Sequence, residues 1–405
     1  MNSVIRIKLS VMMLLQFFIW GIWFVTMGTY LANSLKANGL QIGAAYGMMA
    51  IATIISPFII GIIADRFFAP KKVFALLHFT GGIVLFGLSR IVDVNTFNWV
   101  LLLYALLYAP TLGLASSIAF SQLKDVEKSF SEIRVFGTIG WIIAGVSIDK
   151  LFNISTQDLG LTFTIAAIAS VLLAAFSLFL PDSAKATVAV NETKTSIIGN
   201  EAFVLFKNRS FTVFFITSIL ICIPLSFYYS LTNLFLNEVG LENATSKMAF
   251  GQFSEAAFII LIPFFLKRWG VKWMIVAGMI AWVIRFLFFR YGDAGENNWM
   301  LITGIVLHGI CYDFFFVTGQ IYTDRVAPKQ YRNAAQGMIT MATYGIGMWI
   351  GSILSGFVAK NAAISETQHQ WDVIWLVPAA IAAVVMIMFI ALFRNKDTDT
   401  TVQTA

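Results

Sequence analysis

Long apolar stretches separated by short polar segments repeat along the whole chain. An α-helix needs about 20 apolar residues to cross a bilayer, and twelve stretches approach or exceed that length. Their hydrophobicity is continuous rather than alternating, which predicts helices and not the strands of a membrane barrel. The expected spans are residues 9–33, 40–64, 73–92, 98–121, 128–150, 160–180, 210–236, 245–266, 272–291, 298–322, 332–358 and 371–393.

The composition agrees with a protein that lies in a bilayer. Hydrophobic residues make up 59% of the chain and charged residues 12%, whereas a soluble domain carries about 25% charged residues. We therefore expect an all-α membrane protein with twelve transmembrane helices in two six-helix halves. The first span is too long for the apolar region of a signal peptide, so it should be retained.

The net charge of +6 is distributed unevenly between the two sides of the membrane. The two ends of the chain and every second loop together hold 19 Lys and Arg residues, and the opposite loops hold six. Basic loops stay on the cytoplasmic side, so both termini are predicted to be cytoplasmic. The positive charge is thus explained by the orientation of the chain in the membrane, and no nucleic-acid partner is expected.

A change of composition in the middle of the chain divides it into two halves. We expect an N-terminal half over 1–180, a cytoplasmic linker with an interfacial helix over 181–209, a C-terminal half over 210–394 and a polar tail over 395–405. A weak internal repeat supports this division. Spans two and eight both end in a Pro-Phe pair, at Pro57 and Pro263, followed by basic residues. Such parallel repeats are typical of transporters.

The most unusual stretch for a membrane helix contains His308, Tyr312 and Asp313. Asp313 lies about 21 Å of helix from Trp299 and about 16 Å from Asp324, which places it near the bilayer midplane. A charge there costs at least about 2.5–3.5 kcal/mol and should face a cavity or a partner. Tyr312 is four residues from His308 and shares its face. Because a buried carboxyl group can exchange protons near neutral pH, Asp313 is a candidate for proton coupling.

Span five places Arg134, Thr138 and Trp141 on one helical face. The helix from Arg134 to Asp149 is only about 21 Å long, whereas the hydrocarbon layer is about 30 Å thick. Span five should therefore start well before Arg134. This favours a cavity-lining role for Arg134 over one in which its side chain reaches the headgroups. The face offers a forked donor, a hydroxyl and a large ring, which is suitable for a polar organic substrate.

Span eight carries Gln252 and Glu255, three residues apart and also near mid-bilayer. An amide donates and accepts hydrogen bonds, and a buried carboxylate can pair with Arg134, bind a hydroxyl or take a proton. In span seven, Ser226 and Tyr229 are further candidate liners. Arg285 is another deep charge, for which a structural ion pair and a site role are equally compatible with the sequence.

The sequence has no phosphate-binding Gly-rich loop, no zinc-ligand spacing and no recognisable nucleophile motif. We therefore expect no catalytic activity, no cofactor and no metal.

Several motifs resemble those of the bacterial nucleoside:proton symporters of the major facilitator superfamily, and the resemblance extends from Leu15 to Leu376. The loop from Gly61 to Lys72 also resembles the superfamily's signature between helices two and three. The more specific motifs are Tyr108-Ala-Pro-Thr-Leu-Gly113, Ile133-Arg134-Val-Phe-Gly137-Thr138, Ser254-Glu255, Ile262-Pro263-Phe264-Phe265, Asp313-Phe314-Phe315 and Ala335-Gln336-Gly337-Met338.

The resemblance implies proton-coupled nucleoside uptake by alternating access across the inner membrane, by a protein expected to be a monomer. It implies substrate and proton roles for Arg134, Thr138, Gln252, Glu255 and Asp313. The chain departs from the family's best-known nucleoside carriers at the remaining candidate liners, which are Trp141, Ser226, Tyr229, His308 and Tyr312. Transport of another polar solute such as a sugar or glycoside is the alternative, and a non-transporting membrane receptor is a second.

Overall fold

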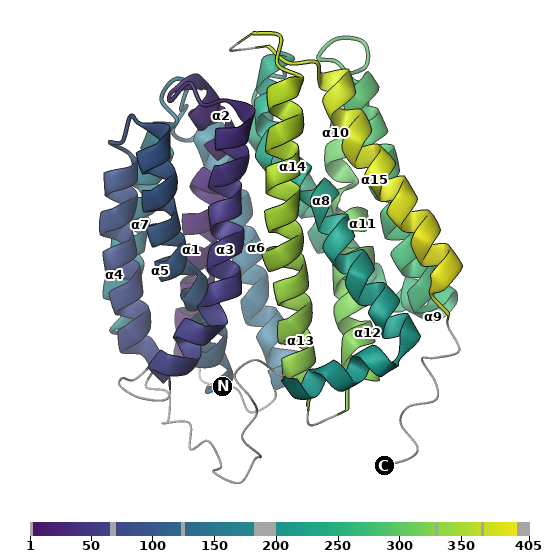
Figure 1. The fold of residues 1–405 in the computed structure, drawn as a ribbon. Helices are drawn as coiled ribbons and strands as arrows, with labels where there is room; N and C mark the ends of the chain where they lie inside the picture. The colour runs from purple at the N-terminus through teal and green to yellow at the C-terminus, as the bar shows by residue number, and fades with distance from the viewer. Residues whose placement is uncertain are drawn as a thin grey trace. The chain divides into compact units, whose positions relative to one another are not determined.

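The computed structural model describes residues 3–64, 70–122, 126–181, 200–328, 331–365 and 368–394. Across these residues the secondary structure is helical, with one isolated antiparallel bridge between Ala363 and His369. The chain forms two compact units, Met1–Thr193 and Lys194–Ala405 (Figure 1). Most of the expected linker (182–199), the expected tail (395–405) and residues 65–69 of the loop motif lie outside the described residues.

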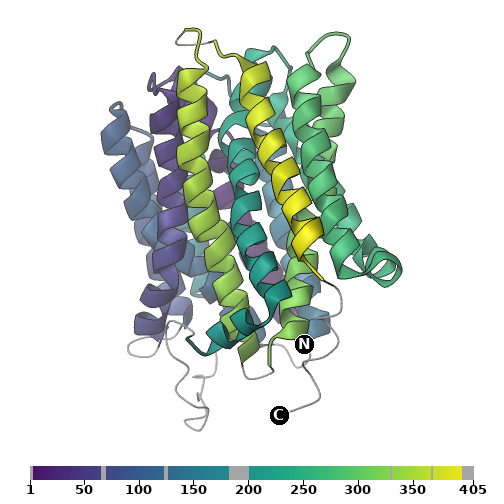
Figure 2. The same ribbon diagram turned by 45° about the vertical axis from the view of Figure 1, so that its right-hand side comes forward.

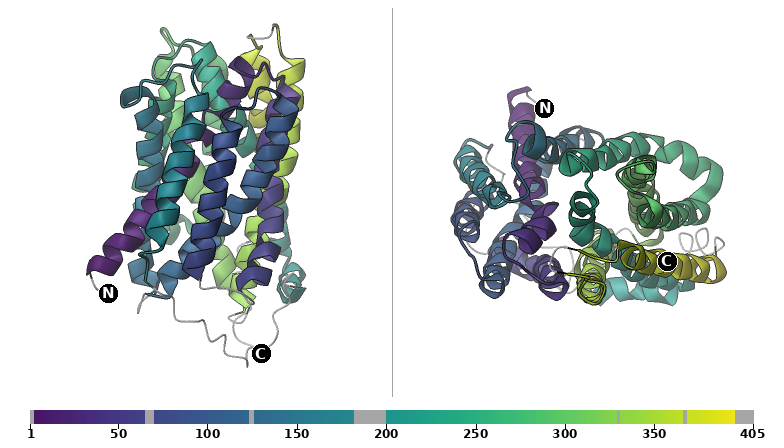
Figure 3. Two further views of the ribbon diagram at one scale, coloured as in Figure 1. Left: turned by 90° about the vertical axis from the view of Figure 1, so that its left-hand side faces the viewer. Right: turned by 90° about the horizontal axis from the view of Figure 1, so that it is seen from above.

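The N-terminal unit is a bundle in which α1 packs against α6 and α7, α4 packs against α5 and α7, and α3 packs against α5. Figure 3 shows these helices running side by side. The described helices of this unit are α1 (Ser3–Phe24), α2 (Met27–Asn33), α3 (Gly39–Ala64), α4 (Pro70–Leu88), α5 (Val94–Phe120), α6 (Val126–Lys150) and α7 (Gly160–Ser177).

In the C-terminal unit, α9 packs against α10, α11 and α15, while α8 packs against α14 and α15. Two π-helical turns, η2 and η4, interrupt otherwise α-helical spans. The described elements are η1 (Asn200–Lys207), α8 (Arg209–Glu238), α9 (Ala244–Tyr291), α10 (Asn298–Val306), α11 (His308–Tyr312), η2 (Asp313–Val317), α12 (Thr318–Val326), α13 (Arg332–Thr340), η4 (Met341–Gly347), α14 (Met348–Asn361) and α15 (Trp371–Leu392).

The helix α9 contains two of the expected spans. Its 48 residues would extend about 72 Å if straight, more than twice the hydrocarbon thickness. The chain reverses at Gly270, whose φ of 69° lies in the left-handed region that favours glycine. Figure 2 shows the hook formed there. In the described residues, ten helices are long and apolar enough to cross a membrane. With α9 folded back on itself and α6 added, this is consistent with twelve spans, and the predicted all-α architecture is confirmed.

The start of α5 is fixed by a side-chain cap. Asp93 accepts hydrogen bonds from the backbone nitrogen and the hydroxyl of Thr96, each at 2.7 Å. These bonds hold the pKa of the exposed Asp93 carboxyl below its usual 3.8, because they stabilise the ionised form. The cap satisfies one of the donors that a helix N-terminus leaves free.

Candidate functional site

Close contact between α9 and α11 creates the central feature of the C-terminal unit. A Cβ atom at Gly309 would lie 2.5 Å from the carbonyl carbon of Ser254, and one at Gly251 would lie 3.0 Å from the Cβ of His308. Only glycine permits backbones to approach so closely. The two glycines therefore bring the helix that carries Glu255 directly against the helix that begins with His308.

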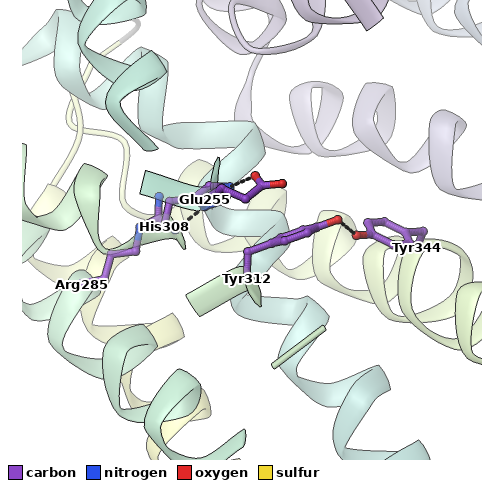
Figure 4. Close-up of polar contacts among 5 residues, drawn as sticks. All are labelled: Glu255, Arg285, His308, Tyr312 and Tyr344. Carbon is purple, nitrogen blue, oxygen red and sulfur yellow. Dashed lines mark hydrogen bonds and ion pairs between the residues drawn. The ribbon is translucent and has the colours of Figure 1, made fainter. Parts of the chain in front are cut away.

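Three of the polar groups predicted from the sequence form a chain across this contact. The guanidinium of Arg285 donates from Nη1 to Nδ1 of His308 at 3.0 Å. On the other side of the ring, Nε2 of His308 lies 3.9 Å from Oε2 of Glu255. Figure 4 shows the three side chains in this order. Solvent exposure increases along this chain of side chains, because Arg285 is completely buried while the Glu255 side chain is 25% exposed.

Arg285 lies among aromatic rings. Its guanidinium carbon is 3.4 Å from the ring centre of Tyr228, 5.4 Å from that of Trp282 and 5.6 Å from that of Phe289. In the described part of the chain no carboxylate lies within ion-pair distance of Arg285, and its Nε and Nη2 have no hydrogen-bond partner. From the sequence, Arg285 could either form an ion pair or contribute to the site. Among the described residues its neighbours are an imidazole and aromatic rings, with no acidic partner. The π faces attract the cation, which offsets part of the cost of burying it.

Tyr228 also contacts His308 directly. The two rings stack with centroids 5.1 Å apart, and the ring of Tyr229 approaches His308 edge-on at 6.3 Å. His308 is therefore 1% exposed. The histidine predicted as a liner lies behind Glu255, between that carboxylate and the arginine.

Tyr312 forms a second polar contact, with a residue that sequence reasoning missed. Its hydroxyl is hydrogen-bonded to the hydroxyl of Tyr344 in η4 (Figure 4). Tyr344 also stacks on Phe316. Both tyrosines are half-buried. The span that contains Tyr344 carries no deep charge from which a site could be predicted. The sequence signal was a phenol group among Gly and Met residues.

Asp313 is the first residue of the π-helical turn η2 and is completely buried. Neither carboxyl oxygen has a hydrogen-bond partner among the described residues. An ionised carboxylate at such a position costs at least about 2.5–3.5 kcal/mol. π-helical turns inside α-helices are frequent at functional sites. The role of Asp313 in proton coupling stays a prediction.

The two other candidates of this unit are Ser226 and Gln252. Ser226 is completely buried where α8 meets α14. A Cβ atom added at Gly351 would lie 2.7 Å from the Cβ of Ser226. Gln252 is half-buried, one turn before Glu255 on α9. Their roles as liners stay predictions.

In the N-terminal unit, the helix α6 presents the expected arginine to an aromatic surface. The guanidinium carbon of Arg134 lies 4.0 Å from the ring centre of Phe17 on α1. The Trp141 ring meets Trp20 edge-on at 5.4 Å. Thr138 is half-buried, as are Arg134 and Trp141. Arg134 and Trp141 therefore border a set of rings from α1, a surface suited to a planar solute.

A buried polar network that the sequence did not indicate joins four helices of the same unit. Gln16 Nε2 donates to the hydroxyl of Thr111 at 2.7 Å, and Gln16 Oε1 lies 2.7 Å from Nε2 of His78. The other ring nitrogen of His78 is 3.1 Å from the hydroxyl of Ser170. His78 is 2% exposed. The sequence signals were single polar residues, such as Gln16 and His78, in otherwise apolar spans.

Comparison with known proteins places the whole chain among transporters. A family model described as "Nucleoside H+ symporter" matches residues 2–398. The chain is 39% identical to the putative nucleoside transporter YegT of Escherichia coli (strain K12), over 97% of this chain and 95% of that protein. It is 35% identical to the xanthosine permease of the same organism, over 97% of each chain. The crystal structure of the nucleoside transporter NupG superposes with a TM-score of 0.88 at 32% identity, covering 97% of this chain and all of that one.

Proposed function

The chain belongs to the nucleoside H+ symporter family, and from this membership we propose that it takes up a nucleoside together with protons. The match of the family model over residues 2–398 carries the proposal. The fold is that of the major facilitator superfamily, and the relatives are transporters rather than enzymes. Transport of a sugar, the alternative from sequence, has weaker support: the maltose permease of Geobacillus stearothermophilus is 22% identical.

Substrate binding is proposed at the polar and aromatic groups of both units. In the N-terminal unit, Arg134 and Thr138 donate hydrogen bonds and Trp141 supplies a stacking face. In the C-terminal unit, Glu255 is the half-exposed acceptor at the end of the Arg285–His308 chain. The remaining proposed residues are Ser226, Tyr229, Gln252, His308 and Tyr312.

Proton coupling is proposed at Asp313 and Glu255. Asp313 is buried without a hydrogen-bond partner among the described residues, so its charge can be removed by protonation without breaking an ion pair. Glu255 lies on the neighbouring helix α9. A conformational change that exposes one carboxyl group to alternate sides of the membrane would couple its protonation to substrate movement.

The remaining features follow from the sequence. We place the protein in the bacterial inner membrane as a monomer with cytoplasmic termini, because the Lys and Arg residues concentrate on one side. The proposed halves are 1–180 and 210–394, with residues 181–209 as the linker and 395–405 as the tail, and transport would proceed by alternating access.

Uptake of labelled uridine into proteoliposomes with an imposed inward proton gradient tests the proposal. Wild-type protein should concentrate uridine only while the gradient lasts. Asp313→Asn and Glu255→Gln should abolish concentration, and at least one should retain gradient-independent exchange. Concentration by both variants at the wild-type level would contradict the assignment of the coupling residues.

The substrate class needs a separate measurement. Excess unlabelled nucleosides should inhibit uridine uptake, while maltose and sucrose at the same concentration should not. Inhibition by the sugars with no effect of nucleosides would replace the proposed substrate by the alternative one.

A further inference from the structure

The contact between Arg285 and His308 determines the protonation of the histidine ring. A guanidinium has only donors, so the His308 Nδ1 that faces it at 3.0 Å must be an acceptor without a proton. A neutral imidazole carries its single proton on the other nitrogen. The hydrogen of His308 therefore lies on Nε2, the nitrogen that faces Glu255.

We propose that Arg285 is a positioning residue for substrate recognition: it fixes His308 as the Nε2–H tautomer and so aims a donor at Glu255. This inference deepens the proposed function and depends on Glu255 contacting the substrate. At 3.9 Å, Nε2 and Oε2 of Glu255 are too far apart for a direct hydrogen bond, but a small movement of the half-exposed carboxylate closes the distance.

The surroundings of Arg285 hold it in this orientation. The Tyr228 ring stacks on both the guanidinium and the imidazole. Its centre lies 3.4 Å from Cζ of Arg285 and 5.1 Å from the centre of the His308 ring. Trp282 and Phe289, on the same helix as Arg285, complete the enclosure. A fully buried charge with no acidic partner in the described residues would be a poor choice for packing alone. In the described part of the chain, the hydrogen bond of Arg285 goes to His308, which indicates that the buried charge serves to orient this ring.

A His308 ring without a fixed tautomer would orient Glu255 less well. With the proton on Nδ1, the ring would present a lone pair to Glu255, and the two acceptors would repel each other. The carboxylate would then lose its orientation toward the substrate. Fixing the tautomer beforehand avoids that loss, in the way that outer partners fix the ring of a metal-binding histidine.

The tautomer can be measured directly in the wild-type protein. The chain has three histidines, so nitrogen-15 NMR of histidine-labelled protein in lipid nanodiscs gives few signals, and His308→Gln identifies the signal of His308. We expect a protonated Nε2 and an unprotonated Nδ1. A protonated Nδ1, in either the other tautomer or the imidazolium, would overturn the inference whatever the protein transports.

Variants then link the tautomer to recognition. Arg285→Met removes the donor and should mix the two tautomers and raise the KM for uridine about tenfold, with a smaller change in maximal rate. Arg285→Lys keeps a charged donor and should restore much of the affinity. Arg290→Met, on the same helix one turn and a half away, is the matched control and should leave the KM unchanged. A folded Arg285→Met variant with the wild-type KM would contradict the positioning role.

Substitution of the histidine separates the two ring nitrogens. The amide nitrogen of Gln reaches the place of Nε2, whereas that of Asn reaches the place of Nδ1. His308→Gln should therefore bind uridine better than His308→Asn, and the reverse order would argue against the proposal. If the wild-type protein transports no nucleoside at all, the proposed function fails, and the NMR result still decides the tautomer.

Discussion

Gln16 and His78 are joined by a hydrogen bond of 2.7 Å inside the N-terminal unit, and each also lies beside a hydroxyl group, that of Thr111 or of Ser170. The Thr111 hydroxyl donates to the carbonyl of Tyr108 at 2.6 Å, so it accepts from the amide nitrogen of Gln16. The amide oxygen of Gln16 then faces His78. On the other side of the ring, the Ser170 hydroxyl lies 3.1 Å from Nδ1 of His78 and donates to the backbone carbonyl of His78 at 2.8 Å. Four helices thus share one network around a buried imidazole.

Removal of Gln16 should destabilise the protein because it leaves buried groups without partners. We expect Gln16→Ala to lower the free energy of unfolding by about 1–3 kcal/mol. Thermal melting in detergent measures the effect as a lower transition temperature. Gln122→Ala, at a half-buried position just beyond α5, is the control and should melt like the wild type. Equal melting of all three proteins would show that the network contributes nothing to stability.

The forked geometry of Arg134 should matter for substrate affinity beyond its charge. Lysine keeps the charge but not the planar group that lies 4.0 Å over the ring of Phe17. We expect Arg134→Lys to raise the KM for uridine about tenfold. Arg6→Lys is the comparison, since Arg6 forms a half-exposed ion pair with Glu132 at 2.9 Å. It should change the KM by less than about twofold. A similar KM in both variants would remove Arg134 from the binding site.

The contact of α9 with α11 should tolerate no side chain at Gly309. The Cβ of alanine would lie 2.5 Å from backbone and side-chain atoms of Ser254, so the helices must separate. We expect Gly309→Ala to lower both the melting temperature and uridine uptake. Gly87→Ala meets no atom within 4 Å and should melt at the wild-type temperature or above, because alanine favours a helix by up to about 1 kcal/mol.

The cap of α5 should make stability depend on pH at low pH. The pKa of Asp93 in the folded protein lies below its ordinary 3.8. The ionised form therefore contributes its full stabilisation above pH 3.8 and loses it as the pH falls through the folded value. Asp93→Asn keeps a capping oxygen that does not titrate. The melting temperature of the wild type relative to this variant should be constant between pH 7 and 5 and should fall toward pH 3. A difference that grows on acidification would have the wrong sign.

The apolar pattern predicted the spans well because bilayer thickness limits helix length. The expected break between residues 266 and 272 coincides with Gly270, although the chain stays helical on both sides of it. Asp313 and Glu255 could be selected by depth alone. The partners of Arg285 could not, because Tyr228 and His308 lie on α8 and α11, whose contacts with α9 only the fold creates. Tyr344 was missed for the same reason.

The π-helical turns at Asp313–Val317 and Met341–Gly347 affect how relatives should be compared. Each such turn holds one residue more than an α-turn. Residues after it are rotated about 100° around the axis from where a helical wheel drawn through the preceding residues would put them. An ungapped alignment with a relative that lacks either turn would therefore assign corresponding residues to different faces. Alignments through these two helices need a one-residue gap at the turn before faces are compared.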